Sequence, residues 1–153
     1  MPKEIERKFL VTSDQWRTAQ GKSYRQGYLC RSEQRSVRVR TTPDGAYLTV
    51  KGLSTTITRL EYEYEIPMTE AQELLDSMCI KPIIEKTRYK VVHHGMIWEV
   101  DEFHGDNTGL VVAEIELESE DQEFPKPEWV CEEVTEDPRY LNVNLVVNPY
   151  SSW

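Results

Sequence analysis

The sequence is short of cysteine, histidine and long apolar runs, and each shortage argues against a class of protein. Cys30, Cys79 and Cys131 are odd in number and show no CxxC or Cys/His spacing, which argues against a disulfide framework and a zinc site. We expect them to be reduced packing residues in a cytoplasmic protein. No apolar stretch approaches the ~18 residues that a membrane helix needs, and no signal peptide precedes the first predicted strand.

Positive charge is also scarce, since 27 acidic residues outnumber 18 lysines and arginines and give a formal net charge of −9. A general nucleic-acid binder takes its affinity from a basic face, so this balance argues against one. An anionic ligand stays compatible with it, because net charge averages over surface and interior. No repeat, low-complexity tract or Gly/Ser linker divides the chain, which predicts a single domain over residues 1–153.

What the chain does contain is charge that alternates with apolar side chains. In KEIERKFLV, Glu4, Glu6 and Lys8 fall on one face of a predicted strand, because side chains two apart on a strand share a face. A solvated edge strand would explain this segment if it stood alone. The same pattern recurs in later segments, which favours a shared function for the charged faces.

The segment RSVRVRTTPDGAYLTVKG predicts a hairpin with its turn at Asp44-Gly45. That turn would set Arg40 opposite Thr49 and Arg38 opposite Lys51. Directly opposed like charges destabilise a hairpin unless an anion lies over them. The cations on this face therefore indicate a polyanionic ligand.

Three further segments repeat the alternation, and one of them predicts a second hairpin with its turn at His94-Gly95. Their charged faces carry Arg59, Glu61, Glu63 and Glu65; Lys86, Arg88 and Lys90, with Lys90 opposite Glu99 and Arg88 opposite Asp101; and Glu114, Glu116 and Glu118.

Together these segments resemble the CYTH superfamily, the triphosphate tunnel metalloenzymes. EIERKFL fits its ExExK signature; RVR, the lysine of LTVKG, LEYEYEI, EKTRYK and AEIELE look like its later strands in the same order; and RQGYL at 25–29 is similar to its short bacterial members. The resemblance implies an α+β fold, namely an eight-stranded antiparallel β-barrel with a charged interior, the triphosphate tunnel, and helices packed outside.

Such a barrel must cover its outward apolar face with other elements. Capping-box patterns predict helices over Ser13–Gln20 and Glu70–Met78. Proline near a first-turn position favours further helices after Pro127 and after Pro138. Polar composition predicts surface loops over Leu53–Thr58 and Glu118–Lys126.

The resemblance also implies a site for a linear triphosphate. Arginine offers phosphate a planar fork and lysine a compact point charge. The expected substrate-binding cations are Lys8, Arg38, Arg40, Lys51, Arg59, Lys86 and Arg88, with Arg59 and Lys90 in the tunnel lining or at its mouth.

Carboxylates cannot bind phosphate directly and need a divalent metal between them and the anion. Ligands that offer only oxygen favour Mg²⁺ or Mn²⁺. The resemblance places metal binding on Glu4, Glu6, Glu114 and Glu116. Glu61 and Glu63 are further metal candidates, which could instead orient the arginines or assist the attacking water. The expected catalytic residues are Glu4, Glu6, Lys8, Glu63 and Tyr28, with core packing left open for Tyr28 and with Asp101 as a partner of Arg88.

We therefore expect a metal-dependent phosphohydrolase that cleaves the terminal phosphate of inorganic triphosphate, with thiamine triphosphate and nucleoside triphosphates as related substrates. A class IV-type adenylate cyclase and a non-catalytic polyphosphate-binding module are the alternatives. Acidic pairs near both ends of the chain argue against the module, since binding alone does not require them. The expected partner is a small-molecule triphosphate, without nucleic acid or membrane, and the sequence leaves a homodimer open.

Overall fold

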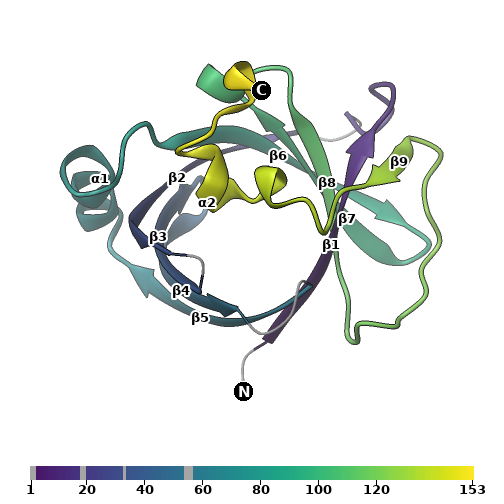
Figure 1. Ribbon diagram of the computed structural model, residues 1–153, viewed down its shortest axis with the longest axis horizontal. Helices are drawn as coiled ribbons and strands as arrows, with labels where there is room; N and C mark the ends of the chain where they lie inside the picture. The colour runs from purple at the N-terminus through teal and green to yellow at the C-terminus, as the bar shows by residue number, and fades with distance from the viewer. Residues whose placement is uncertain (1–2, 18–19, 33, 54–56) are drawn as a thin grey trace.

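The computed structural model describes residues 3–17, 20–32, 34–53 and 57–153. Its strands form one closed ring in the order β5-β4-β3-β2-β6-β7-β8-β1, with β1 pairing back onto β5 (Figure 1). All neighbours are antiparallel, so the predicted eight-stranded antiparallel barrel is confirmed. The strands are β1 (Lys3–Val11), β2 (Lys22–Arg31), β3 (Arg35–Thr42), β4 (Gly45–Leu53), β5 (Thr58–Ile66), β6 (Ile84–His93), β7 (Met96–Phe103) and β8 (Val111–Glu116).

A ninth strand, β9 (Val130–Glu133), lies outside the ring. It pairs with the second half of β1, where Phe9 faces Glu133 and Val11 faces Val130. The first half of β1 pairs with β5 instead. One long strand therefore both closes the barrel and supports the outer connection that follows β8.

The hairpin of β6 and β7 has the predicted register. Lys90 pairs with Glu99, and Arg88 pairs with Asp101. The turn between them holds His94 at φ 50° and Gly95 at φ 77°. Positive φ at both central residues matches the twist of a two-residue hairpin, which explains why this turn could be predicted.

The hairpin of β3 and β4 has a different register from the predicted one. Arg38 faces Thr49 and Arg40 faces Tyr47, so the turn residues are Pro43 and Asp44. Proline has its φ preset for the first turn position, and the Asp44 backbone N–H donates to Thr42 Oγ1 at 3.1 Å. A shift of two residues leaves every side chain on its predicted face, and it also keeps Arg38 from lying directly opposite Lys51.

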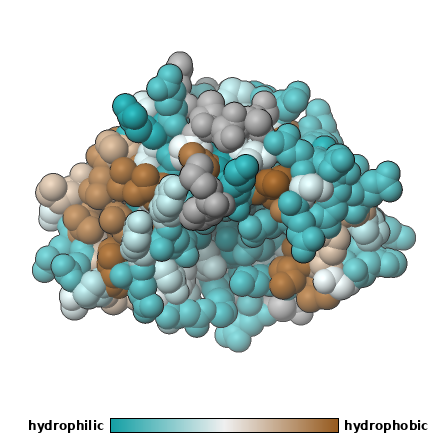
Figure 2. Space-filling view, turned by 90° about the horizontal axis from the view of Figure 1, so that it is seen from below, coloured by the Kyte–Doolittle hydropathy of each residue, from teal (hydrophilic) through white to brown (hydrophobic). Residues whose placement is uncertain are grey.

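Helix α1 (Met68–Ser77) covers the outside of β3 and β4 and confirms the second predicted helix. Its buried residues Ala71 and Leu75 pack with Val39 and Ala46. The predicted capping box is wrong, because the helix begins after Pro67 and has no side-chain cap. Figure 2, seen from below, shows a largely hydrophilic surface with a hydrophobic area toward the side on which α1 lies.

The helix predicted over Ser13–Gln20 is wrong for the residues that are described there. Residues 13–17 form bends and a turn, and residues 18–19 lie outside the described ranges. Ser13 has φ 58°, and its carbonyl accepts a hydrogen bond from the Trp16 indole at 2.8 Å. Burying Trp16, which is 2% exposed, against the barrel determines this segment more strongly than the capping pattern does.

The helix predicted after Pro127 is also wrong, because this segment turns directly into β9. Helices after Pro138 are confirmed in a short form, as η2 (Pro138–Tyr140) and α2 (Asn142–Leu145). Two further 3₁₀ turns, η1 (Gly105–Asn107) and η3 (Tyr150–Ser152), complete the described helices. No described helix has the length and apolar character that crossing a membrane would require.

Two hydrophobic clusters lie against the outer face of the barrel, and a third closes one end of it. In that third cluster, Tyr28 and Phe103 from the strands pack with Val134, Leu145 and Val146 from the C-terminal segment. Figure 1 shows α2 in front of the upper part of the ring. The C-terminal segment therefore forms a wall of the barrel interior as well as part of the core.

The remaining expectations about the surface had mixed outcomes. Cys79 is buried as predicted, but Cys30 and Cys131 are exposed, so their expected packing role is wrong. Both lie at irregular places, Cys30 at a register shift in β2 and Cys131 on the outer strand β9. The connection 118–126 is a surface loop as predicted. The surface loop predicted over Leu53–Thr58 is wrong at its ends, since Leu53 ends β4 and the buried Thr58 begins β5, and its residues 54–56 lie outside the described residues.

Candidate active site

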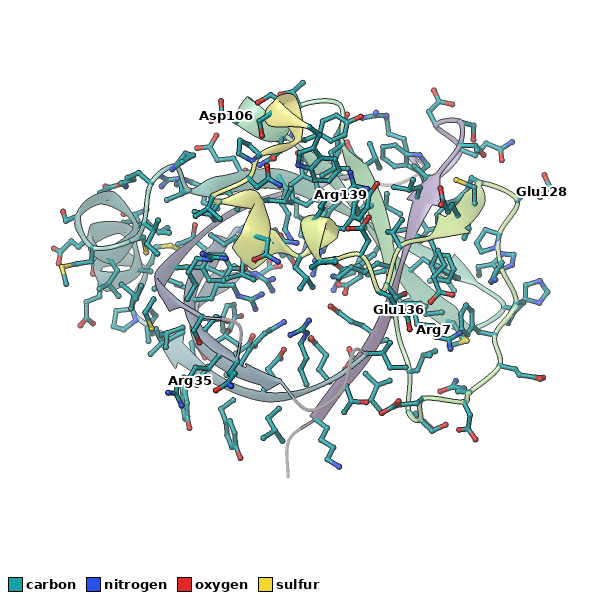
Figure 3. All side chains as sticks on the ribbon, viewed as in Figure 1. Arg7, Arg35, Asp106, Glu128, Glu136 and Arg139 are labelled. Atoms are coloured by element: carbon teal, nitrogen blue, oxygen red, sulfur yellow. The ribbon has the colours of Figure 1, made fainter. Side chains whose placement is uncertain are left out.

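A cavity of about 520 Å³ occupies the interior of the barrel. Figure 3 shows side chains that end in nitrogen or oxygen pointing into the ring of strands, whereas Arg7 lies on the outer side of β1. The cavity brings together all the residues predicted for catalysis, substrate binding and metal binding except Lys90: Glu4, Glu6, Lys8, Tyr28, Arg38, Arg40, Lys51, Arg59, Glu61, Glu63, Lys86, Arg88, Glu114 and Glu116.

Lys8 bridges two carboxylates that belong to neighbouring strands. Its Nζ lies 3.0 Å from Glu6 Oε1 and 2.7 Å from Glu114 Oε1. Burial opposes charge on all three groups, but the ion pairs outweigh it: the pKa of Lys8 is raised, and the pKa values of Glu6 and Glu114 are lowered. All three side chains are therefore charged near neutral pH.

Lys51 forms a second bridge of the same kind. Its Nζ lies 3.0 Å from Glu4 Oε1 and 3.3 Å from Glu61 Oε2. Glu61 comes from the adjacent strand β5, where it pairs directly with Lys51, while Glu4 reaches in from β1. The two lysines thus hold carboxylates from three strands, β1, β5 and β8.

Asp101 is fully buried and holds two cations. Arg88 donates to it through Nε at 2.7 Å and through a terminal nitrogen at 2.9 Å, which confirms the expected pairing. Lys86 Nζ lies 2.8 Å from Asp101 Oδ2. Burial would raise the pKa of Asp101, but Arg88 and Lys86 lower it to about 2. Burial, together with Arg88 and Arg40, lowers the pKa of Lys86 to about 7 in spite of Asp101.

Arg38 and Arg40 on β3 lack carboxylate partners among the described residues. A terminal nitrogen of Arg38 donates to Thr49 Oγ1 at 3.4 Å, and the buried Arg38 Nε has no hydrogen-bond partner in the described parts of the chain. Arg40 Nε donates to Gln26 Oε1 at 3.1 Å. Burial and the neighbouring Arg38 and Arg88 lower the pKa of Arg40 to about 10. This side of the cavity is therefore deficient in negative charge.

Glu63 and Lys90 illustrate the margins of the cavity. Glu63 accepts a hydrogen bond from Thr49 Oγ1 at 3.3 Å, and Thr49 in turn contacts Arg38. This chain of contacts favours an orienting role for Glu63. Lys90 is exposed and does not line the cavity, so a place in the lining is wrong and the mouth of the tunnel stays a prediction.

The polar residues that sequence reasoning missed include Arg31 and Asn142 in the cavity wall and Gln26, which bonds to Asn142 and Arg40. Gln26 shares a strand face with Tyr28, so the alternation in β2 could have revealed it. Arg31 has the wrong spacing for that face, but the register shift after Tyr28 brings it opposite Ser36 on the inner side. Asn142 comes from the irregular C-terminal segment, where no periodic signal exists.

The chemistry of the carboxylates fits a hard divalent cation. Burial and the negative charges of Glu4, Glu6 and Glu99 raise the pKa of Glu116, which shows that this corner has more acid than the neighbouring cations neutralise. Carboxylate oxygens are ligands that Mg²⁺ and Mn²⁺ prefer. Within the described residues, no three acidic, histidine or cysteine side chains stand in a metal-binding arrangement, since lysines lie between the carboxylates.

Comparison with known proteins supports the resemblance of the strand segments to the CYTH superfamily. The family model described as the CYTH domain matches residues 2–150. An inorganic triphosphatase of Acetivibrio thermocellus is 58% identical over 154 residues, covering 100% of this chain and 99% of the relative. An inorganic triphosphatase of Nitrosomonas europaea is 38% identical over 152 residues, covering 95% and 97%.

A solved structure shares the fold along almost the whole chain. It is a crystal structure of an inorganic triphosphatase, with a TM-score of 0.67 and 35% sequence identity over 94% of this chain and 97% of that one. Family model, sequence relatives and structure agree with the charged barrel described above. The chain belongs to the CYTH domain family, the triphosphate tunnel family.

Proposed function

We propose that this protein is an inorganic triphosphatase that uses Mg²⁺ or Mn²⁺ to hydrolyse linear triphosphate to orthophosphate and pyrophosphate. One observation carries the proposal: the barrel sets cations and carboxylates on opposite walls. β3, with Arg38 and Arg40, stands four strands from β8 in either direction around the eight-stranded ring. Glu114 and Glu116 project inward from β8.

A second pair of facing strands repeats this opposition of cations and carboxylates. β6, with Lys86 and Arg88, stands four strands from β5, which carries Glu61 and Glu63. A linear triphosphate between these walls would meet arginines and lysines on one side and carboxylates on the other. Guanidinium and ammonium groups pair with phosphate oxygens directly, whereas carboxylates act on a phosphate only through a cation.

The residues then divide into three tasks. Arg38, Arg40, Lys86 and Arg88 bind and orient the phosphate chain, and Asp101 keeps Arg88 in place. Glu4, Glu6, Glu114 and Glu116 would hold the metal, with Glu61 beside them. When bound, the metal neutralises phosphate oxygens and makes a water molecule more acidic. The cationic wall would position the terminal phosphate and the carboxylate wall would position the metal, so that the water lies in line with the terminal phosphorus.

The relatives favour the triphosphatase over the alternatives. Both sequence relatives described above are named for inorganic triphosphate, and one of them matches this chain along its full length. A purely polyphosphate-binding module would need the cationic wall alone. We also propose a single domain over residues 1–153 in the cytoplasm, where the free thiols of Cys30 and Cys131 at exposed positions would stay reduced.

Phosphate release from the purified protein tests the proposal. With Mg²⁺ or Mn²⁺, we expect tripolyphosphate to give orthophosphate and pyrophosphate, and exhaustive chelation to abolish turnover. Thiamine triphosphate and ATP should be poorer substrates by kcat/KM. Full activity after chelation would contradict metal dependence. Cyclic AMP as the main product from ATP, formed more efficiently than tripolyphosphate is cleaved, would replace the triphosphatase with a cyclase.

A further inference from the structure

The two lysine bridges place ammonium groups on the carboxylates that would hold the metal. Lys8 contacts Glu6 and Glu114, and Lys51 contacts Glu4 and Glu61, all within 3.3 Å. These pairs are largely shielded from solvent, since the exposed side-chain fraction is 7% for Lys8 and 18% for Lys51. Ion pairs at such sites are screened by salt much less than surface pairs.

An ammonium group in this position competes with a metal. Each carboxylate oxygen that forms an ion pair with Lys8 or Lys51 is one that a cation would need as a ligand. Four carboxylates are involved, and they come from β1, β5 and β8. Binding of a divalent cation alone must therefore displace ammonium groups that then have no second anion to pair with, which weakens metal binding.

A triphosphate supplies that second anion. Its oxygens would lie in the cavity that both lysines and the arginines of β3 line. Lysine has a flexible four-carbon stem, so its ammonium can turn from a carboxylate to a phosphate oxygen while its backbone stays in the strand. The charges stay balanced, since each ammonium exchanges its two carboxylate partners for phosphate oxygens and leaves those carboxylates available to the metal.

We propose that Lys8 and Lys51 are exchange cations, which hold the metal-binding carboxylates until triphosphate draws them away, so that substrate and metal bind with positive cooperativity. This proposal rests on the proposed function, because it takes triphosphate as the ligand. By linkage, whatever the anion adds to metal affinity, the metal adds equally to anion affinity. The protein would then assemble its metal site mainly when substrate is present.

Binding of Mn²⁺, followed by the electron paramagnetic resonance of the free ion, tests the exchange without turnover. Removing an ammonium should make Mn²⁺ bind more tightly in the absence of any anion. We expect Lys51→Met, and separately Lys8→Met, to lower the Mn²⁺ dissociation constant about tenfold, as expected when a competing charge-assisted contact is removed. Addition of imidotriphosphate should then strengthen Mn²⁺ binding less in these variants than in the unaltered protein.

Two further variants separate exchange from a general charge effect. Lys51→Arg keeps the positive charge and should bind Mn²⁺ as weakly as the unaltered protein. Arg38→Met removes a buried cation whose only hydrogen bond among the described residues goes to Thr49, so it should leave the Mn²⁺ dissociation constant within about threefold. Circular dichroism checks that each variant is folded. If one of the two lysine-to-methionine variants does not fold, the other still tests the exchange.

The outcomes distinguish this proposal from the proposed function. Equal or weaker Mn²⁺ binding in both lysine-to-methionine variants, or an equal gain in Arg38→Met, overturns the exchange. If the unaltered protein nevertheless hydrolyses tripolyphosphate, the triphosphatase stands without it. If the lysine variants bind Mn²⁺ more tightly but tripolyphosphate is not cleaved, the triphosphatase fails and the competition between lysine and metal remains.

Discussion

Lys86 shows how the barrel balances a single buried charge. It is 2% exposed and meets Asp101 from β7, Arg88 on its own strand, Arg40 from β3 and the more distant Glu114 from β8. Burial and the two arginines lower the pKa of Lys86 to about 7 despite Asp101. In the unfolded chain, a lysine titrates near 10.4. At a pH between these two pKa values, Lys86 is protonated in the unfolded chain and neutral in the folded protein.

This difference predicts how stability depends on pH. Because the unfolded state binds more protons, the Lys86 contribution makes the free energy of unfolding rise as pH rises from 7 toward 10, and stay lower below pH 7. The slope approaches about 1.4 kcal/mol per pH unit. Urea unfolding at pH 6, 7, 8 and 9 should show the unaltered protein gaining stability relative to Lys86→Met above pH 7. Parallel curves for both proteins would mean that Lys86 keeps an ordinary pKa.

At the scale of elements, the C-terminal segment contributes most to the site beyond the strands. Asn142, the first residue of α2, accepts hydrogen bonds through Oδ1 from Lys86 Nζ at 2.8 Å and from Gln26 Nε2 at 2.9 Å. Gln26 in turn accepts from Arg40 at 3.1 Å. One asparagine from outside the barrel thereby orients cations on two strands, β6 and, through Gln26, β3.

Replacing Asn142 with Leu should therefore reduce triphosphate turnover without unfolding the protein. Loss of an acceptor for a charged donor corresponds to about 1.5–3 kcal/mol, or roughly a tenfold to hundredfold lower kcat/KM. Asn142→Asp keeps an acceptor and should retain more activity than Asn142→Leu. Asn148→Leu is the matched control, since Asn148 is exposed and its side chain accepts only from Ser152 among the described contacts. Steady-state kinetics that rank all three variants alike would contradict the assignment.

The elements also show where prediction from sequence works. Strands β1, β5, β6 and β8 alternate with a period of two, and that period alone assigns their charged side chains to one face. Register in a hairpin depends on which two residues turn. A turn at Pro43-Asp44 lies one residue earlier than the predicted turn and shifts the cross-strand register by two residues. Arg31 and Asn142 lie on the tunnel because of a register shift and an irregular segment. Neither feature leaves a periodic signal in the sequence.

For the whole molecule, the net charge of −9 hides an interior in which positive charge is concentrated. Strands on one half of the ring contribute Arg38, Arg40, Lys86 and Arg88, and the facing half contributes carboxylates. Closing the barrel forces these like charges together on each side. An anion with several charges relieves the repulsion on the cationic side, so ligand affinity and the cost of burying unpaired cations arise from the same arrangement.

Arg38 allows this relation to be measured, because its buried Nε has no partner in the described parts of the chain. Arg38→Met should raise the free energy of unfolding of the ligand-free protein by about 1–2 kcal/mol, since it removes an unsatisfied buried donor. With chelator present, tripolyphosphate at about 100 times its dissociation constant should stabilise the unaltered protein by roughly 2.7 kcal/mol, and at the same concentration the variant by less. Arg7→Met, on the outer side of β1 in Figure 3, should keep the full ligand effect. Urea unfolding in a phosphate-free buffer measures both effects. A less stable Arg38→Met protein that tripolyphosphate stabilises as much as the unaltered protein would mean that Arg38 stabilises the fold and does not bind the anion.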